Sequence, residues 1–540
     1  MQFSSMKQQH NPLINDYQNQ QSRVMKHFDY DPYTETTYSE RLQALQEKNM
    51  DRDKLIQALT EMNNQWGAPG STYDAIERLK EKHSAVVIGG QQAGLLTGPM
   101  YTINKVISVI QFAKQQESQL GVPIVPVFWI AGEDHDFDEV NHVFVSEQMR
   151  LKKHSLTQQP EGKQPVSDIP IDGEALTSWV DQLFETLPET EHTKQLYHMI
   201  QDCWEQSSTY VDFFARFLYQ LLDGEPIILA DSGHPAMRHL EQEAFSHLIE
   251  QQEDISHGVH SAIQQLQEQG YSPSLDVGPN DAHLFYHLNN ERVLLVRDDE
   301  GNWVGKQNEV LLTTQEVLQT ARETPERLSN NVVTRPIMQE WLFPTLAFIG
   351  GPGEVGYWAA LKPAFHALGM EMPPVQPRLS FTLIDRNVEK TLTKFGINAE
   401  YAVEYGLEDS KVTWLAAQHN PPVERVAQEV KDAIRGVHEP LRQMANDMGA
   451  NLGELGDKNL YYLHSNIDFI EKRLRQAVEE KYDNEIRQFD LAHHAIHPAN
   501  GLQERIWNPL PFMNNYGPCF IREMAREPFS FRNNHYIVYL

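Results

Sequence analysis

Two glycine-rich stretches of the sequence could bind an anionic group. The first, residues 89–98, follows a short apolar run and precedes a helical pattern that Pro99 opens; the second, residues 350–356, follows another apolar run. The start of a helix leaves backbone N–H groups unpaired and carries a partial positive charge, so phosphate or carboxylate can bind there. Lys105, in the first turns of the predicted helix, would add a full charge. The alternative is a tight turn with a surface lysine, because a glycine loop alone is a weak signal.

His135 stands in a cluster of acidic residues directly after the apolar run 122–130. A histidine among carboxylates can act as a general base with a raised pKa, or it can bind a metal. We therefore predict a catalytic role for His135, together with Asp134 and Asp136. The alternative interpretation is a solvated acidic loop.

Two arginines could hold a substrate carboxylate, although arginines before prolines or strands are as often structural. They are Arg335, in the sequence NNVVTRP, and Arg378, in the sequence QPRLS. Residues 351–356 match G-x-G-x-x-G, but they follow a late strand, so the indication of nicotinamide binding is weak. Neither glycine loop is followed by a Walker lysine–serine or lysine–threonine pair. Cys203 and Cys519 have no partners at metal-ligand spacing and are interpreted as buried cysteines.

Five short apolar runs must position these residues, and we interpret them as parallel strands. Four begin after Ser84, Gly121, Glu225 and Pro344, and the fifth lies within residues 373–385. With the strands numbered along the chain, we predict the spatial order 3-2-1-4-5. In this order the strand sequence changes direction between the first and fourth strands, and ligands bind at such a point, beyond the carboxyl ends of the strands. The two glycine loops follow those two strands. This order therefore predicts that both loops border one cleft.

Helical spacing of apolar residues predicts the remaining elements. We expect a helical layer over residues 33–82, a long helical pattern over 235–269, and two stripes, 430–448 and 460–474, forming an antiparallel coiled coil. Its connection is a break over residues 449–456, and Pro440 should kink the first helix. The predicted domains are 1–147 (N-terminal helices and first half of the core), 148–208 (first insertion), 209–270 (core continued), 271–330 (second insertion, a β-hairpin or meander), 331–388 (second half of the core), 389–498 (coiled coil) and 499–540 (a tail packing on the core).

Composition excludes several classes of function. The chain has 540 residues, 75 acidic and 45 basic side chains and a formal charge of −30, which opposes nucleic-acid binding. No apolar run approaches the length of about 20 residues that a membrane helix needs. Two cysteines cannot form a disulfide framework, and the N-terminus lacks the apolar core of a secretory signal. We expect a soluble cytoplasmic protein with no nucleic acid or membrane as partner.

Four blocks of sequence resemble the family of the bacillithiol biosynthesis cysteine-adding enzyme, BshC. They are GGQQAGLLTGPMYTINK, PVFWIAGEDHDFDEVN, NNVVTRPIMQEWLFPTLAFIGGPGEVGYW and MPPVQPRLSFT. The resemblance implies a carbon–nitrogen ligase that adds cysteine to glucosaminyl-malate in the last step of bacillithiol biosynthesis. It also implies an α/β fold with a Rossmann-like, doubly wound parallel sheet similar to class I nucleotidyltransferases, two connecting insertions, and a coiled coil that forms a homodimer.

That superfamily holds nucleotide phosphates with an HxGH-like element at the start of the first helix. Residues 101–105, YTINK, occupy this place without an HxGH, and only Arg378 and Ser380 correspond to the lysine-rich loop after the last strand. ATP or ADP is the candidate cofactor, its consumption is left open, and no metal is predicted. The predicted residues for binding substrate or nucleotide are Gly90, Gln91, Gln92, Gly94, Thr97, Gly98, Tyr101, Thr102, Asn104, Lys105, Arg335, Gly351, Gly353, Glu354, Tyr357, Arg378 and Ser380.

The chemistry of amide formation assigns roles within this set. The attacking amine must be neutral, so His135 or a neighbouring carboxylate is expected to take its proton, while Lys105 and Arg378 hold anionic groups. Two other functions remain open: a nucleotidyltransferase acting on a different sugar or acid, and a non-catalytic nucleotide-binding scaffold built on a coiled coil.

Overall fold

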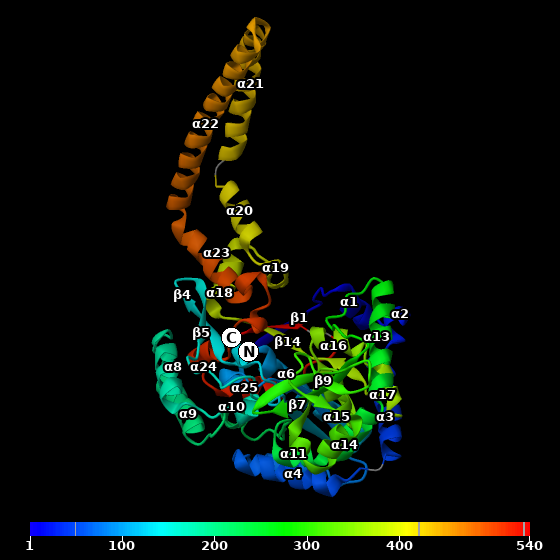
Figure 1. Ribbon diagram of the computed structural model, residues 1–540. Helices are drawn as coiled ribbons and strands as arrows, with labels where there is room; N and C mark the ends of the chain where they lie inside the picture. Colours follow the sequence, from blue (N-terminus) through cyan, green and yellow to red (C-terminus); the bar gives the residue numbers. More distant parts are fainter. Residues whose placement is uncertain (49, 419–421, 533–534) are drawn as a thin grey trace. The chain divides into compact units, whose positions relative to one another are not determined.

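The computed structural model describes residues 1–48, 50–418, 422–532 and 535–540 (Figure 1). The chain divides into two compact units. The larger contains Phe3–Thr382 and Glu504–Ile537, and the smaller contains Leu383–Gln503 with Met1–Gln2 and Val538–Leu540. Within the described ranges, no helix combines the length and the apolar character needed to cross a membrane.

A five-stranded parallel sheet forms the centre of the larger unit, in the order β13-β12-β2-β3-β6. Counted along the chain this order is 5-4-1-2-3, so the predicted order is confirmed. Every residue of β3 is buried, as a parallel sheet covered by helices requires. The bounds are β2 Ala85–Gln91, β3 Ile124–Ile130, β6 Ile228–Asp231, β12 Thr345–Gly350 and β13 Val375–Pro377.

The fifth predicted strand is wrong in its extent, because residues 373–385 form two strands instead of one. Only β13 joins the central sheet, and β14 (Ser380–Ile384) belongs to another. The backbone N–H of Arg378 still bonds to Gly350 O, at 2.9 Å. The next N–H, of Leu379, donates instead to the Ser108 hydroxyl at 2.9 Å, and this diverts the chain.

Helices connect and cover the strands. The helix α6 (Tyr101–Leu120) follows the first glycine loop, contacts β2, β3 and β12, and ends at Gly121 in the left-handed conformation (φ 68°). It starts two residues after Pro99. The other helices of this half are α1 Pro12–Gln18, α2 Ser22–Met25, α3 Thr37–Gln46, α4 Arg52–Gln65 and α5 Gly70–Arg78, preceded by β1 Gln2–Met6.

The segment between β3 and β6 begins with a short helix and a β-hairpin. The hairpin strands, β4 and β5, cross the predicted boundary at residue 147, and Val143 and Val145 alternate with more exposed residues as a half-buried strand requires. The bounds are α7 Phe137–Val140, β4 His142–Glu147, β5 Arg150–Ser155, α8 Gly173–Glu185, α9 Thr193–Glu205 and α10 Tyr210–Leu221.

The helical pattern predicted over residues 235–269 is confirmed, and three helices share it. Glu241 lies between the first and second, and Gln251, whose geometry is not helical (φ −102°, ψ 11°), separates the second from the third. An antiparallel sheet follows, in the order β10-β9-β8-β7-β11. The bounds are α11 Pro235–Leu240, α12 Gln242–Glu250, α13 Gln252–Glu268, β7 Asp281–Leu288, β8 Glu291–Arg297, β9 Trp303–Gly305, β10 Leu311–Leu312, α14 Thr314–Glu323, β11 Leu328–Asn330, α15 Thr334–Leu342, α16 Pro352–Trp358 and α17 Lys362–Ala367.

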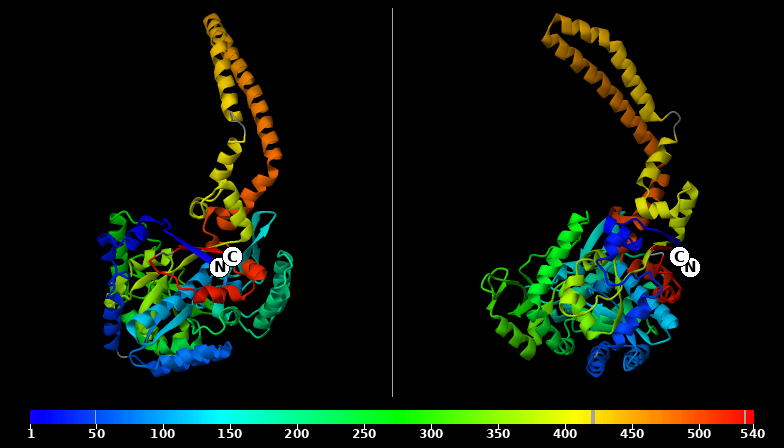
Figure 2. Two further views of the ribbon diagram at one scale, coloured as in Figure 1. Left: turned by 180° about the vertical axis from the view of Figure 1, so that it is seen from behind. Right: turned by 90° about the vertical axis from the view of Figure 1, so that its right-hand side faces the viewer.

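The smaller unit contains the predicted coiled coil, seen in Figure 2 as a long helical hairpin. Its helices α21 (Val423–Met448) and α22 (Ala450–Lys481) pack against each other, and α21 continues through Pro440. The predicted break over residues 449–456 is too long, because Gly449 alone makes the turn (φ 141°). The neighbouring helices are α18 Arg386–Phe395, α19 Ala399–Tyr405, α20 Glu408–Ala416 and α23 Asp483–Ile496.

The C-terminal tail returns to the larger unit from Glu504 onward. The Asn508 side chain donates to the carbonyl oxygens of Leu96 and Gly98, at 2.8 and 2.7 Å, and so ties the tail to the first glycine loop. The remaining elements are α24 Leu510–Tyr516, α25 Cys519–Arg526 and β15 His535–Tyr539.

Candidate active site

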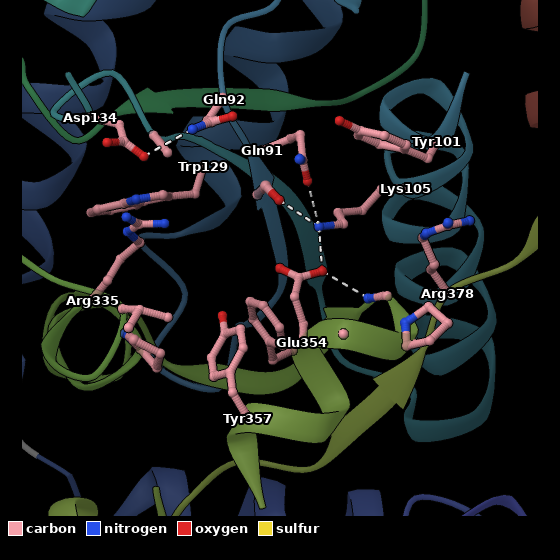
Figure 3. A pocket seen from close by; sticks show the side chains of 18 of the residues that line it. Gln91, Gln92, Tyr101, Lys105, Trp129, Asp134, Arg335, Glu354, Tyr357 and Arg378 are labelled. Carbon is pink, nitrogen blue, oxygen red and sulfur yellow. Dashed lines mark hydrogen bonds and ion pairs between the residues drawn. The ribbon is translucent and has the colours of Figure 1, made fainter. Parts of the chain in front are cut away.

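A pocket with a volume of about 380 Å³ lies in the larger unit, at the carboxyl ends of β2, β3 and β12 (Figure 3). Both glycine loops border it, as the strand order requires. Twelve of the predicted site residues line it: Gly90, Gln91, Gln92, Tyr101, Lys105, Asp134, Arg335, Gly351, Gly353, Glu354, Tyr357 and Arg378.

Lys105 connects the two glycine loops at the floor of this pocket. It is almost fully buried, and its Nζ atom donates to Gly90 O at 2.7 Å, Gln91 Oε1 at 3.0 Å and Glu354 Oε2 at 2.5 Å. Burial lowers the pKa of Lys105, and the Glu354 carboxylate opposes this effect. A lysine so enclosed keeps its charge only if the carboxylate stays beside it.

Glu354 also caps the helix after the second loop. Its Oε2 atom accepts the backbone N–H of Gly351 at 2.7 Å, in the first turn of α16. The N–H group that we expected to bind a ligand anion is thus already paired with a carboxylate of the protein.

Arg378 is likewise neutralised from within the chain. Its Nη1 and Nη2 atoms bind the two oxygens of Glu504 at 2.8 and 2.6 Å, and Asn104 Nδ2 donates to Glu504 at 2.6 Å. Burial works against ionisation of Glu504, but the Arg378 guanidinium lowers the pKa of this carboxyl to about 2. Arg378 therefore lines the pocket as half of a fixed, bidentate ion pair.

At the end of β3, Asp134 faces the pocket and His135 lies behind it. Asp134 accepts from Gln92 Nε2 and from the His135 backbone N–H, both at 2.9 Å, and from Arg292 Nη1 at 3.3 Å. The His135 ring Nδ1 lies 3.8 Å from Asp134 Oδ1 and 3.3 Å from Arg292 Nη1. His135 does not line the pocket. Asp136 is exposed and occupies the N-cap position of α7, but its side chain forms no capping hydrogen bond.

The predicted rise in the pKa of His135 is wrong. Burial and the Arg292 guanidinium lower its pKa, and together they outweigh the Asp134 carboxylate. The imidazole is consequently neutral at neutral pH. In the described ranges, no three histidine, cysteine, aspartate or glutamate side chains are grouped closely enough to hold a metal ion.

A buried charge network supports this end of the sheet. Glu133 is fully buried and accepts from Arg238 Nη2 at 2.6 Å and from the backbone N–H of Asn330 at 3.0 Å, while Arg335 Nε lies 3.5 Å away. Burial opposes the charge on Glu133, but Arg238 and Arg335 lower its pKa. The Arg335 side chain extends from this network into the pocket.

Six predicted binding residues lie outside the lining, where they shape the first loop and its surroundings. A Cβ atom on Gly94 would come within 2.9 Å of Gly98 Cα, so the loop closes tightly upon itself. Gly98 has a positive φ of 67°. The six residues are Gly94, Thr97, Gly98, Thr102, Asn104 and Ser380.

Sequence reasoning missed ten residues of the lining. Gln339 could have been found, since it follows Arg335 by four positions in a helical pattern and so shares its face. No local signal points to Arg505, which comes from the C-terminal tail. The missed residues are Trp129, Ala131, Glu139, Ser274, Val332, Pro336, Gln339, Phe348, Pro352 and Arg505.

The buried Asp231, at the end of β6, gives a pH-dependent prediction. Burial raises its pKa to about 7, although Gly233 N and Ser167 Oγ donate to it. The folded chain therefore binds a proton that the unfolded chain releases near pH 4, and stability falls between about pH 4 and 7, by up to about 4 kcal/mol. Calorimetry at pH 5 and 8 should show a smaller fall in Tm for Asp231→Asn than for the wild type. Equal falls in both proteins would contradict the assignment.

Comparison with known proteins identifies the family. Residues 1–379 match the family model described as the bacillithiol biosynthesis BshC N-terminal Rossmann-like domain, and residues 381–540 match the BshC C-terminal coiled-coil domain. Relatives named "Putative cysteine ligase BshC" occur in Oceanobacillus iheyensis (42% identity), Bacillus cytotoxicus (39%) and Bacillus cereus strain AH187 (37%). Each alignment covers 98% of both chains. The chain belongs to the bacillithiol biosynthesis BshC family.

Proposed function

We propose that this protein is a cytoplasmic ligase that joins the carboxyl group of L-cysteine to the amine of glucosaminyl-malate, the last step of bacillithiol biosynthesis. The observation that carries this proposal is the match, over nearly the whole chain, to relatives named as cysteine ligases. The pocket lies where the strand order of the sheet reverses, and it is lined by many charged side chains. Both features are consistent with two small, charged substrates.

Amide formation joins a neutral amine to a carboxyl carbon and breaks one carboxyl C–O bond, whose oxygen leaves as water or on the group that activates the carboxyl; the end of β3 can supply a base for the amine proton. Asp134 lines the pocket, and His135, whose pKa is lowered, is neutral at neutral pH and therefore able to accept a proton. We assign Asp134, which lines the pocket, to contact with the amine, and His135, whose Nδ1 lies 3.8 Å from Asp134 Oδ1, to acceptance of the amine proton by way of that carboxylate. Lys105 and Arg378 line the same pocket, but Glu354 and Glu504 already pair with them, so an anionic substrate group would reach them only by displacing those carboxylates.

ATP or ADP stays the candidate cofactor, but the second glycine loop does not fit a phosphate as it stands. Glu354 already occupies both the Gly351 N–H and the Lys105 ammonium. A phosphate at this place would have to displace that carboxylate. We therefore derive no step through a nucleotide.

The direct test is product formation. The purified protein, incubated with glucosaminyl-malate and L-cysteine with and without ATP, should form bacillithiol detectable by mass spectrometry. Product in both reactions would remove the nucleotide from the mechanism. No product in either reaction would contradict the ligase and favour a nucleotidyltransferase of other specificity or a non-catalytic scaffold.

The base assignment predicts a loss of turnover with little loss of binding. His135→Ala should lower kcat by about 10²-fold or more, since general acid–base catalysis contributes that much. Binding of glucosaminyl-malate, measured by calorimetry, should change little because His135 lies outside the pocket lining. A matched control is His239→Ala, at an exposed histidine remote from the pocket residues in sequence. Full turnover of His135→Ala across pH 6 to 9 would overturn the assignment.

We further propose that the protein forms a homodimer through α21 and α22. Each helix keeps an exposed apolar stripe although the two pack against each other. On α21 it contains Leu441 (60% exposed) and Met448 (71%), and on α22 it contains Leu455 (59%) and Phe469 (66%). A helix with such a stripe normally buries it against a partner, and a second copy of this hairpin offers a complementary one.

The dimer can be tested by placing charges in the stripe. Light scattering should show a dimer for the wild type and a monomer for the double variant Leu441→Glu, Phe469→Glu, because a buried unpaired charge opposes association. The control Lys472→Glu changes an exposed polar residue of α22 and should remain dimeric. A double variant that stays fully dimeric would exclude this surface as the interface.

A further inference from the structure

Three buried polar atoms in the pocket lining have no hydrogen-bond partner among the described residues. They are Trp129 Nε1, Arg335 Nε and Gln339 Oε1. Trp129 is fully buried and Gln339 is 4% exposed, so water does not readily satisfy them. An unsatisfied buried group costs about 1–3 kcal/mol, and such groups in a pocket point to a ligand that supplies the missing bonds.

The three atoms belong to one wall, which we call the α15 wall: Trp129, Arg335 and Gln339. Arg335 and Gln339 are four residues apart on α15 and therefore share a face of that helix. Trp129, from β3, packs edge-on against Phe343, which follows α15, with ring centroids 6.2 Å apart. Figure 3 shows Trp129 and Arg335 together on one side of the pocket, with Lys105 and Arg378 on the other.

Arg335 is the cation of this wall, and it is only weakly paired. Glu133 accepts from Arg238 through Oε2 at 2.6 Å, whereas Arg335 Nε lies 3.5 Å from Glu133 Oε1, and neither of these two atoms forms a hydrogen bond with a described residue. Asp134 accepts from Gln92 at 2.9 Å. In the part of the chain that the structure describes, no hydrogen bond occupies either Nη atom of Arg335. This guanidinium thus has donors left for an incoming anion.

The chemistry of the wall matches a free amino acid. A guanidinium with free N–H groups, beside an indole N–H, suits a carboxylate. An unpaired amide oxygen suits an ammonium group. The same pocket is lined by Val332, Pro336 and Phe348, which offer apolar surface to a small side chain.

We propose that the α15 wall is the subsite for L-cysteine, whose carboxylate binds Arg335 and the Trp129 N–H and whose ammonium binds Gln339 Oε1. This inference rests on the proposed ligase function. Glucosaminyl-malate, which has two carboxylates and several hydroxyls, then binds the opposite wall, where Tyr101 and Arg505 provide polar groups. The α15 wall favours cysteine over glucosaminyl-malate because a free amino acid requires an anion-binding group and a cation-binding group close together.

The test measures each substrate separately on single variants. Arg335→Met and Gln339→Leu remove the ionic and the amide contact, and Trp129→Phe removes only the indole N–H. Expected increases in KM for cysteine are about 10-fold or more for Arg335→Met and about 3- to 10-fold for the other two. KM for glucosaminyl-malate should stay within about 2-fold. Trp358→Phe is the matched control, since Trp358 is equally buried but lies outside the lining, and it should change neither value.

Binding without turnover keeps the two proposals distinguishable. Calorimetry of the wild type should show binding of L-cysteine, and of L-2-aminobutyrate in competition with it, whereas cysteamine, which lacks the carboxylate, should not compete. Gln339→Leu removes an unpaired atom and should fold normally, so a Tm near that of the wild type validates its result.

Loss of glucosaminyl-malate binding with unchanged cysteine binding in these variants would assign the wall to malate and overturn the inference, while product formation would still support the ligase. A wild type that binds no cysteine and forms no product would refute both.

Discussion

The ion pair between Lys105 and Glu354 is the constraint on which the site depends. Lys105 is buried, so its charge is tolerated only because Glu354 and two carbonyl oxygens surround it. The pair joins residues 249 positions apart, one on the helix after β2 and the other on the helix after β12. Removing one partner of a buried ion pair typically lowers the free energy of unfolding by about 3–5 kcal/mol. The ion pair therefore helps the sheet to hold the two glycine loops next to each other.

The same principle explains why the pocket has two different walls. Near Lys105 and Arg378, the protein supplies its own carboxylates, Glu354 and Glu504, and the cations are fixed before any ligand arrives. Near α15, Arg335 shares Glu133 with Arg238 and keeps donors that nothing in the described chain occupies. A ligand anion gains most where it need not displace a carboxylate of the protein. The cation that is weakly paired is therefore the better candidate for direct recognition.

The sheet could be predicted from the sequence, and much of the pocket followed from it. Short, wholly apolar runs identify buried parallel strands, and one assumption about their order places both glycine loops on one cleft. The end of the central sheet after Arg378 could not be foreseen, because the next backbone N–H, of Leu379, donates to the hydroxyl of Ser108 on another helix. Glu504 was beyond sequence reasoning too: it lies 126 residues from Arg378, and no local pattern connects them.

The pKa of His135 shows why the local sequence was misleading at the centre of the site. Five acidic residues stand within six positions of this histidine, and they suggested a raised pKa. In the fold, Glu133 is paired with Arg238, while Arg292, 157 residues away on β8, places its guanidinium 3.3 Å from the imidazole and 3.7 Å from the centroid of the Phe285 ring. The antiparallel sheet that the chain forms between β6 and β12 therefore contributes a residue to the surroundings of the site. Burial has the larger effect on the pKa of His135, and Arg292 lowers it further; Arg335 and Arg292 together lower the pKa of Asp134. The chemistry of the core thus depends in part on an element outside the parallel sheet.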